Sequence, residues 1–273
     1  MSQRHLDRLF SPRSVALVGA STRAGSVGAV VAENLVKSGF RGPVWPVNPK
    51  HREIAGVPTF HDVSDLPEAP DLAVLCTPPD VVPGIIDRLG ALGTRAAVVI
   101  TAGFGEGGDG HGESLKRAMQ ASARPHQLRI IGPYCLGVVV AGVGLNATFA
   151  HLMPRRGGIA FVAQSGAIIT SVLDWAHGRG IGFSHLVSLG DMADVDFGDM
   201  LDYLASDGST TAVLLYIESI TQARKFMSAS RAAARMKPVI VVKAGRHAEG
   251  SRAVASHTGA LAGTVAVYDA AFR

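Results

Sequence analysis

Residues 14–28 have the sequence SVALVGASTRAGSVG, and this stretch decides the fold that we predict for the chain. Its first five residues form an apolar run that ends at Gly19, as expected of a buried parallel strand. A loop with further glycines follows, and residues 29–38 then have the pattern of a helix. Strand, glycine loop and helix in this order present backbone N–H groups to a phosphate. The glycine spacing departs from the usual dinucleotide fingerprint, so the loop alone is a weak signal.

The same alternation of apolar runs and helical patterns continues along the chain. We expect strands at 44–47, 72–76, 96–101 and 128–131, with helices at 81–92 and 112–122. After a linker-like segment at 153–158, we expect strands at 159–162, 183–189, 212–217 and 238–243, with helices at 168–177 and 220–236. The sequence therefore predicts two α/β units, at residues 1–150 and 151–273. Ligands are expected at the carboxyl ends of the parallel strands.

Composition limits the classes of function. The chain has 273 residues, of which 47% are hydrophobic and 18% charged, so it can bury a substantial core. A net charge of +4 without a dense Lys/Arg run favours anionic small molecules over nucleic acid. Two cysteines in a chain of this size do not form a disulfide framework, and no apolar run has the length of a membrane span. We expect a cytoplasmic protein that binds neither nucleic acid nor membrane.

Several strand ends carry candidate ligand-binding side chains. The second expected strand is followed by Asn48 and Lys50, where an NAD-binding unit usually has Asp or Glu. This disfavours an NAD oxidoreductase and favours a ligand with additional phosphate, although Lys50 could also be an ordinary solvated lysine. Ser165 and Gly166 lie at a strand-to-helix turn, where N–H groups point to the ligand side, or where Ser165 only caps the helix.

Other candidate residues are more isolated in the sequence. Glu218 follows a strand and could hold an imidazole in one tautomer, or cap a helix. His257 lies among small residues in SHTGALAG, residues 256–263, where its imidazole could accept a phosphoryl group or a proton, unless it is only a surface histidine. The segment VAQSG around Ser165 lacks the Gly-x-Ser-x-Gly elbow, which disfavours a serine hydrolase.

Two further features of the sequence do not indicate a site. The acidic residues Asp191, Asp194 and Asp196 have a spacing that suggests a metal, but no converging set of ligands is evident, and we predict no metal site. Cys135 lies beside Tyr134 at a strand end, where nothing in the sequence activates its thiol.

Taken together, these motifs resemble those of the NDP-forming acyl-CoA synthetases, with the ADP-forming acetyl-CoA synthetases most similar and the succinyl-CoA synthetase α subunit more distant. The resemblance covers nearly the whole chain and is carried by residues 10–12, 14–21, 47–50, 132–137, 164–166 and 256–263. Pat-type protein lysine acetyltransferases contain a similar module. The resemblance implies a Rossmann-like CoA-binding domain followed by a flavodoxin-like domain of the succinyl-CoA-synthetase type.

The resemblance also implies a role for each matching residue. His257 matches the phosphorylated histidine and Glu218 the carboxylate that steadies it. The residues implied to bind CoA are Gly19, Ala20, Ser21, Gly25, Val27, Gly28, Lys50, Thr77, Pro78 and Pro79, and those implied to bind phosphate are Ser165, Gly166 and Gly259. Tyr134 departs from the family, which usually has Asn at this position, so the acyl pocket or the activity could differ here.

The implied reaction converts acyl-CoA, phosphate and ADP to acid, CoA and ATP through phosphorylated His257. The ATP-grasp region that would bind ADP or ATP with Mg²⁺ has no counterpart in these residues. We therefore expect an ATP-grasp β subunit or fused domain as partner, an oligomeric assembly, and a chain that is one part of a larger enzyme. The alternative is a non-catalytic module that senses CoA or acyl-CoA for an attached acetyltransferase.

Overall fold

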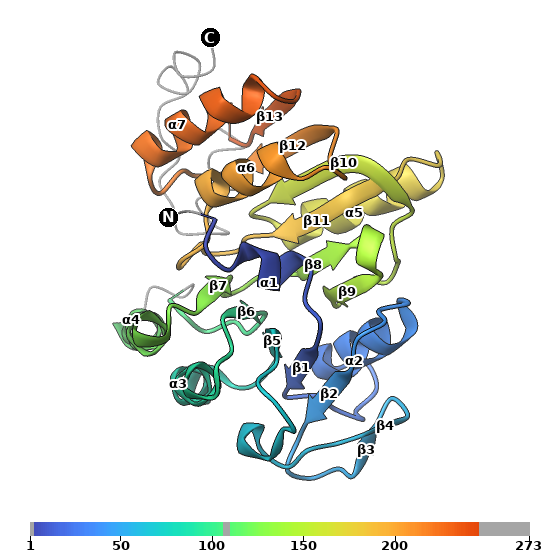
Figure 1. Cartoon of the computed structure of the whole chain (residues 1–273), viewed down its shortest axis with the longest axis vertical. Helices are drawn as coiled ribbons and strands as arrows, with labels where there is room; N and C mark the ends of the chain where they lie inside the picture. The colour runs from blue at the N-terminus through green and yellow to red at the C-terminus, as the bar shows by residue number, and fades with distance from the viewer. Residues whose placement is uncertain (1–2, 106–109, 246–273) are drawn as a thin grey trace.

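The computed structural model of the chain describes residues 3–105 and 110–245, and these residues build two sheets with helices packed on them (Figure 1). The first sheet and its helices form what we call the first unit, in the lower half of Figure 1. The second sheet and its helices form the second unit, in the upper half. The predicted α/β fold with two units is therefore confirmed.

The first sheet is parallel throughout and has the strand order β2-β1-β5-β6-β7. Its strands are β1 (Val15–Val18), β2 (Val44–Val47), β5 (Leu72–Leu75), β6 (Ala96–Val99) and β7 (Arg129–Ile131), and its helices are α2 (Val27–Lys37), α3 (Val82–Leu92) and α4 (Gly110–Ala123). Every residue of β1, β5 and β6 is buried, which explains why these strands are continuous apolar runs in the sequence. The chain leaves β1 toward β2 on one side and returns to β5 on the other, so the switch point at which ligands bind lies beside β1.

The second sheet is mixed and has the strand order β13-β12-β10-β11-β8-β9. Its parallel strands are β10 (Arg156–Ala163), β11 (Phe183–Ser188), β12 (Ala212–Ile217) and β13 (Val239–Lys243), and its helices are α5 (Gly166–His177), α6 (Phe197–Ser206) and α7 (Ala223–Ala234). The hairpin of β8 (Gly137–Val140) and β9 (Leu145–Thr148) pairs antiparallel with β11.

This hairpin changes where the two units divide. We expected the division at about residue 150, but the chain passes from the first sheet to the second between β7 and β8. The hairpin belongs to the second sheet because residues 138–140 bond to residues 185–187 of β11. An antiparallel edge hairpin needs no crossover helix, so it lacks the strand–helix alternation by which the other elements were predicted.

Several short elements complete the described chain. They are α1 (Leu6–Phe10), the small hairpin β3 (Glu53–Ile54) and β4 (Val57–Pro58), and the 3-10 helices η1 (Val63–Asp65), η2 (Pro79–Val81), η3 (Arg124–His126) and η4 (Ala141–Val143). In α1, the Phe10 ring packs at 4.8 Å from the Tyr203 ring and edge-on at 5.5 Å from the His185 ring. The first helix of the chain is thus anchored on the second unit.

The two units share one core. A single hydrophobic cluster contains Val74 and Val98 of the first sheet together with Val138, Leu189 and Phe197 of the second unit. Such continuous apolar packing fixes the two units relative to each other, so side chains from both can build one site. Within residues 3–105 and 110–245, no helix is both long and apolar enough to cross a membrane.

Candidate functional site

A cavity of about 940 Å³, here called the first cavity, opens at the carboxyl ends of β1, β2 and β5. It lies at the switch point where a doubly wound sheet binds its ligand. Of the residues predicted to bind CoA, the cavity is lined by Gly19, Ala20, Ser21, Val27, Gly28, Lys50, Thr77 and Pro78. Gly25 and Pro79 are not among its lining residues, although both belong to segments that form its wall.

The glycines of residues 19–28 bring helix α2 directly against the end of strand β1. Gly19 has a φ of +87°, and a Cβ on Gly28 would lie only 2.1 Å from the Gly19 carbonyl oxygen. Any larger residue at position 28 would push the helix away from the strand. The N-terminus of α2 therefore begins at the cavity wall, where its dipole favours a negatively charged group.

Asn48, at the end of β2, ties two loops of this cavity together. Its side-chain Nδ2 donates to the Ala20 carbonyl oxygen at 2.7 Å, and its Oδ1 accepts from the Lys50 backbone N–H at 2.8 Å. The residue that replaces the usual acid of an NAD site is thus used to shape the phosphate loop. This geometry accounts for Asn48 without any ribose contact.

Cationic side chains outnumber acidic ones around the first cavity. Its lining contains Arg23, Lys50 and Arg88, with His51 and His61, against the single carboxylate of Asp62. Asp62 is already paired with Arg88, with 3.5 Å between Oδ2 and Nη2. A cavity with this charge balance suits a ligand with several phosphate groups. Sequence reasoning missed Arg88 because its position depends on how α3 packs, and it passed over Arg23 within the glycine loop.

A second cavity, of about 510 Å³, adjoins the first and is lined from both units. Val27, Cys76 and Thr77 line both cavities, so the two cavities share this part of their walls. The second cavity contains Ser165, Gly166 and Glu218, the described members of the predicted phosphate and catalytic sets. The fold thus brings together Val27 and Glu218, which lie 191 positions apart in the sequence.

Helix α5 points its N-terminus into the second cavity. Ser165 is its N-cap, because its Oγ accepts from the Ile168 N–H at 3.5 Å, and it also lines the cavity. Gly166, Ala167 and Thr170 of the first helical turn line the cavity. A helix N-terminus with small residues offers N–H donors and a positive dipole end to an anion.

Glu218 is held beside this helix tip by Gln164, which belongs to the motif at residues 164–166 but was given no role in the sequence analysis. The Gln164 Oε1 accepts from the backbone N–H groups of Glu218 and Ser219, both at 2.8 Å, and its Nε2 donates to the Ser219 Oγ at 3.0 Å. Lys243 donates to the Glu218 carbonyl oxygen at 2.9 Å. Glu218 itself is only 5% exposed, so its carboxylate is positioned with little freedom to move.

His257 and Gly259 lie outside the described residues, and the structure does not place them. Their assigned roles therefore remain predictions.

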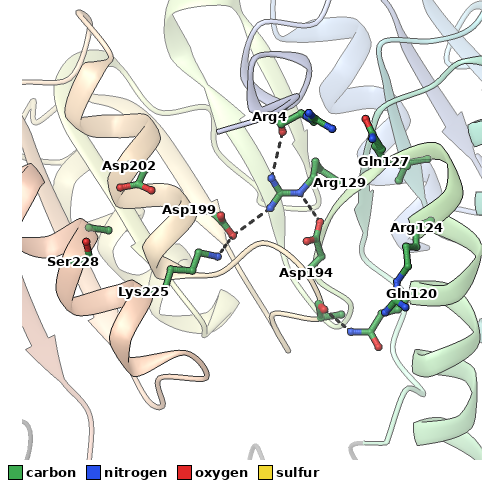
Figure 2. A pocket seen from close by; sticks show the side chains of 14 residues that line it. Arg4, Gln120, Arg124, Gln127, Arg129, Asp194, Asp199, Asp202, Lys225 and Ser228 are labelled. Carbon is green, nitrogen blue, oxygen red and sulfur yellow. Dashed lines mark hydrogen bonds and ion pairs between the residues drawn. The ribbon is translucent and has the colours of Figure 1, made fainter. Parts of the chain in front are cut away.

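The acidic residues Asp191, Asp194 and Asp196, here called the acidic loop, all form ion pairs with basic side chains. Asp194 pairs with Arg129 at 2.8 Å, and the Arg129 guanidinium also contacts the buried Asp199 at 3.2 Å; Figure 2 shows Arg129 between these two carboxylates. Asp191 pairs with Lys116 at 3.6 Å and Asp196 with Lys225 at 3.0 Å. Among the residues that the structure describes, no group of three or more His, Cys, Asp or Glu side chains could hold a metal ion.

Four of these charged residues, Arg129, Asp194, Asp199 and Lys225, line a third cavity of about 760 Å³ between α4 and helices α6 and α7 (Figure 2). Burial raises the pKa of Asp199, even though Lys225 and Arg129 act in the opposite direction. Asp191 and Asp194 thus join the two units through their partners in α4 and β7, whereas Asp196 pairs with α7 within the second unit.

Neither thiol beside the second cavity is activated. Burial raises the pKa of Cys76 to about 12 and that of Cys135 to about 12, so both remain protonated at neutral pH. The Cys135 thiol donates to the Val99 carbonyl oxygen at 3.4 Å, as a packed core residue. The sequence-based expectation that Cys135 is not a nucleophile agrees with this geometry.

Comparisons with known proteins match each half of the chain to a protein-family model. Residues 13–141 match the CoA binding domain model, and residues 156–273 match the succinyl-CoA ligase-like flavodoxin domain model. The chain is 44% identical over 268 residues to "Acetate--CoA ligase [ADP-forming] I" from Archaeoglobus fulgidus, covering 98% of this chain and 39% of the relative. It is 38% identical to "Acetate--CoA ligase [ADP-forming] I subunit alpha" from Pyrococcus furiosus, covering 98% of this chain and 59% of that subunit.

A solved structure gives the same relationship in three dimensions. The acetyl-coenzyme A synthetase 1 of Ca. Korarchaeum cryptofilum, solved with phosphate and ADP, superposes with a TM-score of 0.93 at 40% identity, covering 100% of this chain and 58% of that one. The chain thus spans between 39% and 59% of the length of these relatives.

Proposed function

Because the chain belongs to the NDP-forming acyl-CoA synthetase family, we propose that it supplies the CoA-binding and phosphohistidine-bearing part of such an enzyme. The observation that carries this proposal is that the two cavities adjoin and share Val27, Cys76 and Thr77 in their walls. One cavity is suited to a phosphorylated nucleotide and the other to a small anion beside a helix tip. A CoA thioester extended across both would bring its reactive carbonyl to that tip.

The first cavity would hold the nucleotide end of CoA. The N–H groups of residues 19–28 and the start of α2 would bind the pyrophosphate, with Lys50 and Arg88 as counter-charges for the phosphates. The pantetheine arm would then pass Thr77, whose carbonyl oxygen is fixed by a 2.8 Å hydrogen bond from the Thr101 hydroxyl. The glycine at position 28 permits this arrangement because no side chain intervenes between helix and strand.

The second cavity would be the place of chemistry. A phosphate oxygen attacks the thioester carbonyl carbon, the C–S bond breaks, and the CoA thiolate leaves and takes up a proton, which yields an acyl phosphate. A ring nitrogen of His257 then attacks the phosphorus, and the acid leaves as its carboxylate. The N-terminus of α5 at Ser165 and Gly166 would stabilise the charge on the phosphoryl group, and Glu218 would hold the imidazole.

The last step, transfer of the phosphoryl group from His257 to ADP, we assign to an ATP-grasp β subunit or fused domain that also holds Mg²⁺. We propose that this chain works in an oligomeric assembly with that partner. A relative is an α subunit by name, which supports a division of this kind.

The proposal is tested by labelling. The chain is incubated with acetyl phosphate that carries ³²P, in parallel with His257→Ala, and CoA binding by both proteins is measured by calorimetry. We expect acid-labile label on the wild-type chain alone and equal CoA affinity in both. Label that persists in His257→Ala would refute the assignment of that histidine. CoA binding without label on either protein would instead support the CoA-sensing module.

A further inference from the structure

The wall of the second cavity contains two exposed aromatic rings. Tyr134 and Phe149 are each 40% exposed and both line the cavity, together with the apolar side chains of Ile100 and Leu136. Large apolar rings are seldom left facing water inside a concave site unless a ligand covers them. The apolar wall of this cavity is therefore available to a ligand.

Tyr134 occupies a backbone position that a smaller residue would adopt more easily. Its φ of +55° lies in the left-handed region, where Asn is tolerated far better than a bulky side chain. The surroundings impose this backbone: the Tyr134 N–H donates to the Thr101 carbonyl oxygen at 3.0 Å, and a Cβ on Gly190 would lie 2.6 Å from the Tyr134 carbonyl oxygen. The aromatic ring is thus placed in the cavity at a cost to the backbone, which indicates a function for the ring.

Phe149 reaches the same wall through the register of the β8–β9 hairpin. Gly137 pairs with Thr148, so positions 136 and 149 continue side by side from the end of this hairpin. Leu136 in turn packs against the α5 tip, because a Cβ on Gly166 would lie 2.9 Å from the Leu136 Cβ. Phe149 therefore lies next to the place where the phosphate-binding tip and the loop of Tyr134 meet.

We propose that Tyr134 and Phe149 form an acyl-recognition wall that selects acyl groups bearing an aromatic ring. This inference rests on the proposed function, since it requires the thioester to enter past Val27 and Thr77. An acetyl group ends in one methyl and leaves both rings exposed to water, whereas an aryl group covers them and stacks on them. The 510 Å³ of the cavity leaves room for such a group beside the helix tip.

The test measures the affinity of the full chain for CoA, acetyl-CoA and phenylacetyl-CoA by calorimetry. We expect phenylacetyl-CoA to bind about tenfold more tightly than acetyl-CoA, as one additional aromatic contact allows. Tyr134→Asn and Phe149→Ala should each lower this preference to about threefold or less. Tyr134→Phe should retain the preference because it keeps the ring. The matched control is Trp175→Ala, which removes an exposed aromatic ring of α5 that is 53% exposed and outside the cavity lining.

The outcomes separate this inference from the proposed function. Equal affinity for acetyl-CoA and phenylacetyl-CoA, with CoA still bound, overturns the inference and leaves the proposed function intact. A Tyr134→Asn variant that binds CoA and keeps the full preference also overturns it. If CoA itself fails to bind to the wild-type chain, the proposed function is refuted, and the inference with it.

Discussion

The side chain of Gln164 binds the backbone N–H of Glu218 at 2.8 Å and thereby joins the end of β10 to the end of β12. Gln164 directly precedes Ser165, the N-cap of α5, and Glu218 directly follows Ile217, the last residue of β12. One amide therefore fixes the distance between the helix tip and the carboxylate that we assign to the same reaction. The arrangement of the second cavity depends on this contact.

Replacing Gln164 with Leu should impair phosphorylation more than folding. The change leaves the N–H groups of Glu218 and Ser219 without their acceptor, which should lower the free energy of unfolding by about 2 kcal/mol. Displacement of Glu218 should reduce the rate of labelling by acetyl phosphate about tenfold or more. The control is Gln120→Leu, which removes a hydrogen bond to Ala193 outside the second cavity. Equal labelling by Gln164→Leu and the wild-type chain would contradict the positioning role.

Gly28→Ala tests the contact between strand β1 and helix α2. Alanine at a helical position ordinarily stabilises a protein by about 1 kcal/mol relative to glycine. Here the added Cβ would lie 2.1 Å from a backbone oxygen, so the helix must shift away from the phosphate loop. We expect the affinity for CoA to fall about tenfold or more, measured by calorimetry.

The matched control for this change is Gly178→Ala at the C-cap of α5. A Cβ there meets no described atom within 4 Å, so CoA affinity should not change. Unaltered CoA affinity in Gly28→Ala would show that the helix terminus does not bind the ligand.

Most of the fold could be predicted because each central strand of the first sheet is buried on both faces and therefore appears as an apolar run. Among the larger elements, the β8–β9 hairpin and helix α6 were not predicted, for physical reasons. The β8–β9 hairpin lies at a sheet edge and lacks a crossover helix. Helix α6 begins with a capping box formed by Asp196 and Asp199, and we had interpreted Asp196 as part of an acidic loop.

The candidate site was predictable only where a residue belongs to a local motif. The glycine loop and the turn at Ser165 carry such motifs, and the structure places both beside cavities. Gln164 belongs to the motif at residues 164–166, but no local pattern indicates its hydrogen bond to the distant Glu218. Arg88 gains its position from its contact with Asp62, which no local pattern indicates either. The partners of Asp191, Asp194 and Asp196 were hidden for the same reason.

His185 should make the stability of the chain depend on pH. Burial lowers its pKa to about 4, an effect that Asp207 at 3.7 Å opposes and Lys237 supports. The unfolded chain, in which this imidazole titrates near 6.5, therefore binds the additional proton between pH 6.5 and 4. Stability should be lost as the pH falls through this window, by about 2 kcal/mol between pH 7 and 5.

Urea unfolding at pH 5, 6 and 7 checks this prediction. The variant His185→Gln should lose this part of the pH dependence, whereas His151→Gln should keep it because His151 lies on the surface in a pair with Asp174. The same slope in His185→Gln and the wild-type chain would show that another group is responsible.

Arg129 is expected to hold the two units together. It belongs to β7 of the first sheet and contacts Asp194 and Asp199 of the second unit, and the Asp199 side chain is fully buried. Arg129→Met removes the positive charge that Asp194 and Asp199 share, and Asp199 then keeps Lys225 as its cation. The free energy of unfolding should fall by about 3–5 kcal/mol, as measured by urea unfolding.

The pH dependence of the stability lost in Arg129→Met distinguishes the loss of a cation beside the buried Asp199 from a simple packing defect. The pKa of Asp199 is already raised by burial, and the loss of Arg129, which lowers it, should raise it further. When a carboxyl group has a higher pKa in the folded than in the unfolded protein, the protein loses stability as the pH rises from the unfolded pKa to the folded pKa. Arg129→Met should therefore be more destabilised at pH 7 than at pH 4.5.

The control is Lys37→Met, which breaks the exposed pair with Glu33. It should leave the unfolding midpoint nearly unchanged because solvent screens that pair. If Arg129→Met lost the same stability at both pH values, lost packing and not the buried carboxylate would explain its effect.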